Sequence, residues 1–169
     1  MGRRTKGVKN AATSELLLVL NRAFTGNDAL LHQHIDELSI RTKGRGFTLL
    51  TSEVARIVSA AKAQTGLVTL HLRHTSAALL IQENADPDVR RDLEAFFARL
   101  VPDGDPAFVH TLEGDDDMPA HVRTALTTVN LSIPIANGRM VLGTWQGIYL
   151  WEHRTHPHTR QLIVHVLGE

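Results

Sequence analysis

Hydrophobic and polar residues alternate along several short stretches of the chain, the pattern of β-strands with one buried face. The alternation is clear at residues 37–41 and again at residues 67–72. Other short apolar runs, bounded by turn residues, predict further strands. The predicted strands cover residues 37–41, 47–50, 67–72, 77–81, 132–135, 140–142, 148–150 and 162–164.

Three segments between these strands repeat apolar residues at helical spacing instead. The first follows Thr51 or Ser52, either of which can cap a helix. The second starts at Asp86-Pro87, with a carboxylate at the N-cap and proline at the first helical position. The third covers about residues 118–127. The second helix is expected to present Val89, Leu93, Phe96, Phe97 and Leu100 to the core.

Strands in clusters, separated by about three helices, predict a single α+β domain with a largely antiparallel sheet. Residues 1–30 are more basic and are expected to form a partly disordered arm with one short amphipathic helix at about 14–24. A helix that docks on a partner is the alternative for this arm.

Composition limits the chemistry that the chain can perform. Lysine plus arginine equals aspartate plus glutamate at 18 each, so we expect no nucleic-acid partner and no anionic membrane surface. Cysteine is absent, which excludes thiolate catalysis and Cys-ligated zinc. The apolar run at residues 16–20 is too short for a signal peptide, and no stretch is long enough to span a membrane. We therefore expect a cytoplasmic protein.

Ten histidines make a metal site of imidazoles and carboxylates the first candidate for chemistry. The densest polar group runs from His110 to His121 and contains two imidazoles and four carboxylates. Within it, Asp117 can cap the third predicted helix. No standard metal-binding motif is present, so a solvated acidic turn is the alternative.

A second group, at residues 71–76, contains His71 and His74. In a strand, an odd separation sends the two rings to opposite faces, so only one can join a given site. His74 is the better candidate because it stands where the strand breaks at Thr75-Ser76, and a histidine bonded to backbone is the alternative. The remaining histidine pairs, His32 with His34 and His156 with His158, are interpreted as surface residues.

A third group, Gly143-Thr144-Trp145-Gln146-Gly147, predicts a bend where another chain segment or a ligand approaches closely. Trp145 or Gln146 can line a pocket there, or Trp145 can be a core residue. Arg154 and Arg160 follow, and they can hold a phosphate through paired hydrogen bonds or serve as surface ion-pair residues.

Five blocks of the sequence stand out together: residues 74–79, 83–89, 116–121, 143–147 and 152–154. These blocks resemble the YjbQ-like family, the group labelled secondary thiamine-phosphate synthases. They occur in that family's order and approximate spacing, over about residues 34–169, and leave residues 1–33 as an N-terminal extension.

The resemblance implies an α+β fold, a homotrimer with polar pockets near subunit contacts, and a secondary, weak thiamine-phosphate synthase activity. That reaction couples a hydroxymethylpyrimidine pyrophosphate to a thiazole phosphate and releases pyrophosphate. It needs a divalent metal or arginines to stabilise the pyrophosphate charge. Carboxylates such as Asp116 and Asp117 favour Mg²⁺, whereas the histidines favour Zn²⁺.

Together these patterns assign roles to eleven residues. The predicted metal ligands are His74, His110 and His121, with Zn²⁺ as the first choice. Asp117 is the predicted acid–base or metal-positioning group, and Glu83 supports it beside His74. A metal-dependent hydrolase or lyase and a non-catalytic metal- or ligand-binding trimer remain alternatives. The residues expected to bind a small phosphorylated substrate are Thr75, Ser76, Asn84, Gln146, Arg154 and Arg160.

Overall fold

The structure is a computed structural model that describes residues 31–169, and the helix expected at 14–24 lies outside the described residues. The predicted α+β fold is confirmed, and every strand pairing in this part is antiparallel. None of the described helices is long and apolar enough to cross a membrane. The elements are β1 (His32–Arg41), β2 (Gly46–Leu49), α2 (Thr51–Ala61), β3 (Thr65–Leu72), β4 (Ala77–Glu83), α3 (Pro87–Leu100), α4 (Asp117–Leu126), β5 (Asn130–Ala136), β6 (Arg139–Met140), β7 (Gln146–Glu152) and β8 (Thr159–Gly168).

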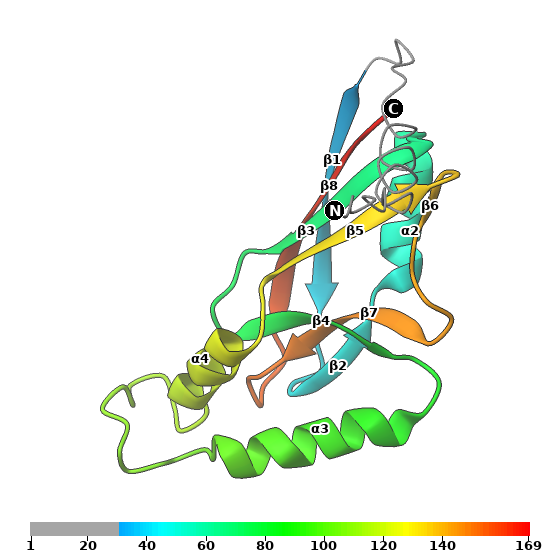
Figure 1. Cartoon of the computed structure of the whole chain (residues 1–169). Coiled ribbons are helices and arrows are strands. Elements are labelled where there is room, and N and C mark those ends of the chain that lie inside the picture. Colours follow the sequence, from blue (N-terminus) through cyan, green and yellow to red (C-terminus); the bar gives the residue numbers. More distant parts are fainter. Residues whose placement is uncertain (1–30) are drawn as a thin grey trace, which may run out of the picture. The chain divides into compact units, whose positions relative to one another are not determined.

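The strands form two sheets, one with the order β1-β8-β3-β5-β6 and one with the order β2-β7-β4 (Figure 1). β1 pairs with β8 along its whole length, from His32 opposite Gly168 to Arg41 opposite Thr159. This strand is longer than predicted, because its first residues are polar and mostly exposed and so show no apolar alternation. The longer pairing fixes where Arg41 and Arg160 lie at one end of the sheet.

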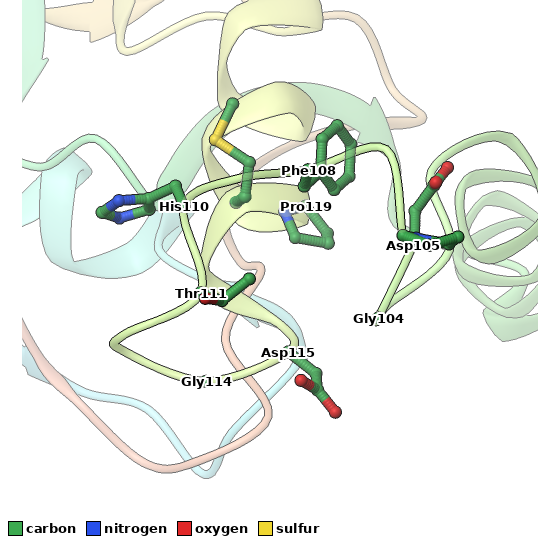
Figure 2. Close-up of a pocket in the computed structure, with 10 residues that line it drawn as sticks. Gly104, Asp105, Phe108, His110, Thr111, Gly114, Asp115 and Pro119 are labelled. Carbon is green, nitrogen blue, oxygen red and sulfur yellow. The ribbon is translucent and has the colours of Figure 1, made fainter.

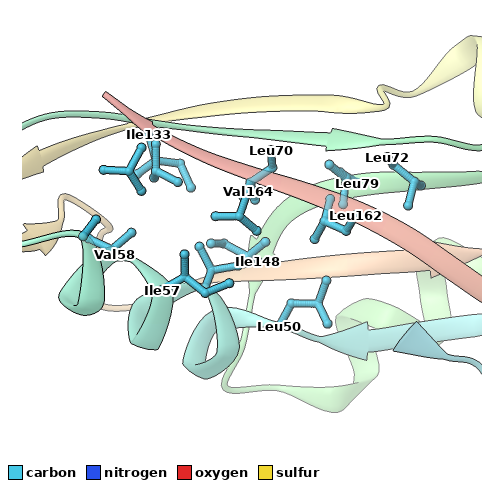
Figure 3. Close-up of a cluster of buried hydrophobic side chains, with 14 of the residues drawn as sticks. Leu50, Ile57, Val58, Leu70, Leu72, Leu79, Ile133, Ile148, Leu162 and Val164 are labelled. Atoms are coloured by element: carbon cyan, nitrogen blue, oxygen red, sulfur yellow. The ribbon is translucent and has the colours of Figure 1, made fainter. Parts of the chain in front are cut away.

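The hydrophobic core lies between the two sheets and is closed on one side by α2 (Figure 3). In β8, Leu162, Val164 and Val166 are buried, while the residues between them are only half-buried. Ile148 and Leu150 approach from the second sheet, and α2 adds Val54, Ile57 and Val58. Each such aliphatic side chain stabilises the fold by about 1.5–3 kcal/mol when fully buried. The core is thus a rigid support for the polar groups at the ends of its strands.

The start of α2 differs from the sequence expectation. The residue at the N-cap is Leu50, and no side chain caps the helix. The hydroxyl oxygen of Thr51 instead accepts a hydrogen bond from the backbone N–H of Ile148, at 2.9 Å. The predicted cap is therefore wrong, because the hydroxyl joins the helix to β7 in place of capping it.

The start of α3 is as predicted, since Asp86 accepts a hydrogen bond from the N–H of Asp88 at 2.8 Å and Pro87 opens the helix. The expectation that its apolar face is buried is wrong, because no α3 side chain is buried in the chain alone. Phe96 and Leu100 remain 52% and 54% exposed. The helix lies along the outer face of the three-stranded sheet, where only part of its apolar stripe finds a partner (Figure 1).

Candidate metal centre

Three side chains converge where the loop after α3 meets α4. His110 comes from the loop, and Asp117 and His121 lie one turn apart on the helix. The Oδ2 atom of Asp117 lies 2.8 Å from Nε2 of His110 and 3.4 Å from Nε2 of His121. One ligand atom from each residue lies within 4.8 Å of the other two, which makes this group able to hold a metal ion.

The tautomer of His121 is fixed by the backbone. Its Nδ1 lies 2.9 Å from the carbonyl oxygen of Thr75, so Nδ1 must carry the proton and donate it. In a neutral ring, the other nitrogen, Nε2, carries the lone pair, and it faces Asp117. Metal-binding histidines usually have such a partner on the nitrogen that does not bind the metal.

Asp117 is oriented by Arg154 and does not cap the helix. Its Oδ1 accepts a hydrogen bond from Nη1 of Arg154, while Oδ2 faces the two imidazoles. The N-cap residue of α4 is Asp116, and it makes no side-chain cap bond. The predicted cap at Asp117 is therefore wrong, because its carboxylate, only 3% exposed, is directed at His110 and Arg154.

Asp116 anchors the opposite edge of the same arginine. It accepts hydrogen bonds from Nε of Arg154 at 3.3 Å and from the N–H and hydroxyl of Thr155 at 2.7 and 2.9 Å. Burial alone would raise the pKa of Asp116, but these hydrogen bonds and the Arg154 charge lower it to about 2. With the bond from Nη2 to the carbonyl oxygen of Glu113, each of the three guanidinium nitrogens of Arg154 donates to a protein group.

The donor set fits a transition metal better than magnesium. Two imidazole nitrogens and one carboxylate oxygen are the ligands that catalytic zinc sites use, with a further position left for water or substrate. Mg²⁺ prefers oxygen ligands and keeps several waters. His110, Asp117 and His121 would hold such a metal.

His74 lies outside this ligand group. Its Nε2 accepts a hydrogen bond from the backbone N–H of Gln161 at 2.8 Å, and its Nδ1 lies 3.4 Å from Nη1 of Arg160. Burial, and next the charge of Arg160, lower the pKa of His74. A neutral imidazole has one lone pair, and Gln161 already uses it here. The role of His74 as a ligand stays a prediction.

Arg160 forms an ion pair with Glu152 at the end of the sandwich. Its Nε donates to Glu152 at 2.7 Å and its Nη2 donates to the hydroxyl oxygen of Ser76 at 3.1 Å. The hydroxyl of Thr42 donates to the same carboxylate at 3.0 Å. Burial would raise the pKa of Glu152, but the bonds from Arg160 and the N–H of Arg154 bring it below its usual value. Glu152 was not among the predicted site residues, although it ends the strongly apolar strand β7.

A second buried layer lies beneath α3. Arg123 is fully buried on α4, and its Nη2 donates to the carbonyl oxygen of Val101 at 2.8 Å. His153 is fully buried beside Trp151, and neither ring nitrogen has a hydrogen-bond partner among residues 31–169. Burial, and next the charge of Arg123, lower the pKa of His153 to about 3. His153 is therefore neutral over the physiological range.

Two pockets open beside the three-residue group. One, of about 470 Å³, is lined by His121 and by His74, Thr75 and Thr124 from neighbouring segments. The other, of about 280 Å³, lies under the loop that carries His110. Figure 2 shows the His110 ring pointing away from Asp105 and Asp115 in that pocket. The larger pocket is the better candidate for a substrate, because His121 lines it together with two other predicted site residues, His74 and Thr75.

Other predicted site residues lie elsewhere. Glu83 pairs with Gln146 at the far end of β4, and the amide of Asn84 donates to the carbonyl oxygen of Gln146 at 3.4 Å. The expectation that Glu83 lies beside His74 is wrong, because the seven-residue strand β4 separates them. Trp145 is 64% exposed, which excludes its core alternative.

Comparison with known proteins agrees with this fold. A UPF0047 protein of Synechocystis is 53% identical over 141 residues, which are 83% of this chain and 96% of that protein. The UPF0047 protein YjbQ of Salmonella typhimurium is 44% identical over 78% of this chain and 96% of its own length.

Solved structures give the same result. A conserved hypothetical protein of Thermus thermophilus has a TM-score of 0.68 at 36% identity, with 76% of this chain and 97% of that chain covered. A YbjQ-like protein of unknown function from Sulfolobus solfataricus has a TM-score of 0.76 at 22% identity, over 83% of this chain and 100% of that chain, and shares the fold. The profile described as UPF0047 protein YjbQ-like matches residues 36–169. This chain belongs to the YjbQ-like UPF0047 family.

Proposed function

We propose that this protein is a divalent-metal enzyme that acts on a small phosphorylated substrate, with His110, Asp117 and His121 as metal ligands. The observation that carries the proposal is the convergence of their ligand atoms within 4.8 Å, beside a pocket that His121 also lines. Zn²⁺ is the metal that we propose, because two of the three donors are imidazoles. Mg²⁺ is the second choice.

The reaction that we propose is the coupling of a hydroxymethylpyrimidine pyrophosphate to a thiazole phosphate, as a secondary, weak activity. Its support is the resemblance of five sequence blocks to the group labelled secondary thiamine-phosphate synthases. A bound divalent cation supplies positive charge for the leaving pyrophosphate. This chemistry needs little beyond positioning and charge stabilisation.

The protein's own groups would position the substrate. Thr75 and Thr124 line the pocket and can bind substrate oxygens through their hydroxyls. Arg154 and Arg160 act as positioning residues in this proposal, because their guanidinium groups already bind Asp117 and Glu152. The phosphate-binding role that the sequence suggested for these arginines therefore has less support.

Hydrolysis of a small phosphorylated metabolite is the second candidate. Its support is the donor set itself, since two histidines, a carboxylate and an open position are the arrangement of water-activating zinc sites. In that case Asp117 remains a ligand, and His74 is a further lining residue of the pocket.

The test is a coupling assay with the purified chain, the metal-stripped chain and the stripped chain with zinc restored. Formation of thiamine phosphate that disappears on stripping and returns with zinc supports the transferase. Release of phosphate from either substrate alone supports the hydrolase instead, provided that it also disappears on stripping and returns with zinc. If the zinc-loaded chain shows neither activity, both enzyme proposals are rejected, and a non-catalytic metal-binding protein remains.

The proposal includes a homotrimer and a cytoplasmic location. The exposed Phe96 and Leu100 on α3 provide apolar surface that a closed assembly can cover.

A further inference from the structure

The segment from Arg41 to Thr48, which runs from the last residue of β1 into β2, lines a pocket of about 400 Å³ outside the proposed metal centre. Three of its lining residues are cationic, and none is an aspartate or a glutamate. A pocket with this charge favours an anionic ligand. The lining residues are Arg41, Lys43, Gly44, Arg45, Gly46, Phe47 and Thr48.

Two of these cations are available to a ligand. Arg45 is not, because it donates two hydrogen bonds to Asp103, at 2.8 and 2.9 Å, and one to the carbonyl oxygen of His153. Arg41 and Lys43 are exposed, and within residues 31–169 neither side chain makes a hydrogen bond or an ion pair. They contrast with Arg154 and Arg160, whose guanidinium groups are already occupied.

The backbone that carries the two cations is fixed by the residue between them. Thr42 is only 3% exposed, and its hydroxyl donates to Glu152. Its N–H donates to the carbonyl oxygen of His158 at 2.8 Å, and the N–H of His158 donates back to its hydroxyl oxygen at 2.9 Å. Because side chains alternate along an extended chain, an inward Thr42 directs Arg41 and Lys43 outward to the same side.

The turn that follows brings backbone, not side chains, to the pocket wall. Gly44 has a φ of +105°, and a Cβ atom there would collide with the carbonyl oxygen of Thr155. Gly46 has a φ of +132°, also in the region that favours glycine. Phe47 stacks on Trp151 and gives the pocket one aromatic wall. Cations, two glycines and one aromatic wall form a site for a small anion with an apolar part.

We propose that this pocket is an anion site that binds the phosphate group of a small phosphorylated molecule through Arg41 and Lys43. Two cationic donors on a rigid segment can contact separate oxygens of one phosphate. The site is independent of the metal ligands, so failure of the metal proposal leaves it standing.

The experiment titrates the full-length chain with inorganic phosphate at constant ionic strength and follows the amide resonances of Gly44 and Gly46. Calorimetry on the same samples gives the affinity. Saturable binding is expected, and the double variant Arg41→Gln/Lys43→Gln should weaken it by about tenfold or more. The control Arg56→Gln/Arg99→Gln removes the same charge from exposed positions on α2 and α3 and should keep the affinity within about twofold.

Three results would overturn the proposal. The first is no saturation at roughly ten millimolar phosphate, with resonances that respond equally to chloride. The second is equal weakening in both double variants, which would indicate a general charge effect. The third is binding that survives Arg41→Gln/Lys43→Gln but is lost in His121→Ala, which would assign the phosphate to the metal centre. Circular dichroism verifies that each variant is folded.

Discussion

His121 donates the proton on its Nδ1 to the backbone carbonyl of Thr75, at 2.9 Å. This single bond decides which nitrogen of His121 can bind a metal, since it leaves the lone pair on Nε2. The same bond joins α4 to the segment that contains Thr75, which lines the larger pocket. The metal site and the pocket are therefore positioned by the same contact.

The first prediction tests whether His74 is a zinc ligand, as the sequence suggested, or whether Asp117 takes that place beside His110 and His121. His110→Ala and His121→Ala should each lower bound zinc per chain well below the parent while the far-UV circular dichroism stays intact. His74→Ala should keep zinc within about twofold, because His74 donates no free lone pair to the group. Zinc content by mass spectrometry decides, and equal losses in all three variants would restore His74 as a ligand.

The second prediction concerns Asp117. Because its side chain caps no helix, Asp117→Asn should act on the metal site and not on the helix end. We expect at least about tenfold weaker zinc binding and a corresponding loss of any activity. The loss of unfolding free energy should stay near 1–2 kcal/mol, because Arg154 keeps Asp116 and the Glu113 carbonyl as partners.

The matched control is Asp115→Asn, which changes an exposed carboxylate two residues away. It should leave both zinc binding and stability unchanged. Unaltered zinc affinity in Asp117→Asn would remove that residue from the ligand set.

The third prediction concerns pH. The pKa of His153 is lowered from 6.5 to about 3 by burial and by Arg123, so the unfolded chain binds a proton there that the folded chain refuses. Above pH 6.5 the neutral His153 costs the folded state no stability. As the pH falls from 6.5 toward 3, the unfolding free energy decreases by up to about 1.4 kcal/mol per pH unit.

The variant His153→Phe should therefore flatten the fall of unfolding free energy in this window. It also removes two unpartnered polar atoms, so stability at neutral pH should be equal or higher. Denaturant unfolding at a series of pH values measures both effects. The exposed His156→Gln is the control and should keep the parent slope; an unchanged slope in His153→Phe would contradict the assignment.

The fourth prediction concerns assembly. Light scattering should give about three times the 18.7 kDa chain mass. The double variant Phe96→Ser/Leu100→Ser should lower this mass, because both residues are exposed apolar groups on α3. A concentration-independent monomer in the parent would defeat the trimer, and a trimer in the variant would exclude this face of α3.

Sequence reasoning predicted the features that short-range patterns encode. The Asp86-Pro87 start of α3 was found because the N-cap carboxylate and the proline are neighbours in sequence. The apolar face of the same helix was wrongly expected to be buried in the core, because periodicity identifies an apolar face but not the surface that covers it. His110 and His121 were found because they belong to one dense polar segment.

Long-range contacts were beyond this reasoning. Glu152 binds Arg160, eight residues along the chain, and also Thr42, which is 110 residues away. No local pattern pairs those positions, so the arginine was assigned to a phosphate instead. Glu83 was placed beside His74, although β4 lies between them in sequence and its extended backbone holds them apart.

All three residues of the proposed metal centre come from one stretch of twelve residues, 110–121. A metal bound there closes only a small loop, so little chain entropy is lost and the ligands need few distant contacts to meet. Capture and release of the ion can therefore follow the local opening of this stretch, while the two sheets stay folded. The exchange rate of the ion would then measure how often the loop and the helix end open locally, and not the global stability of the protein.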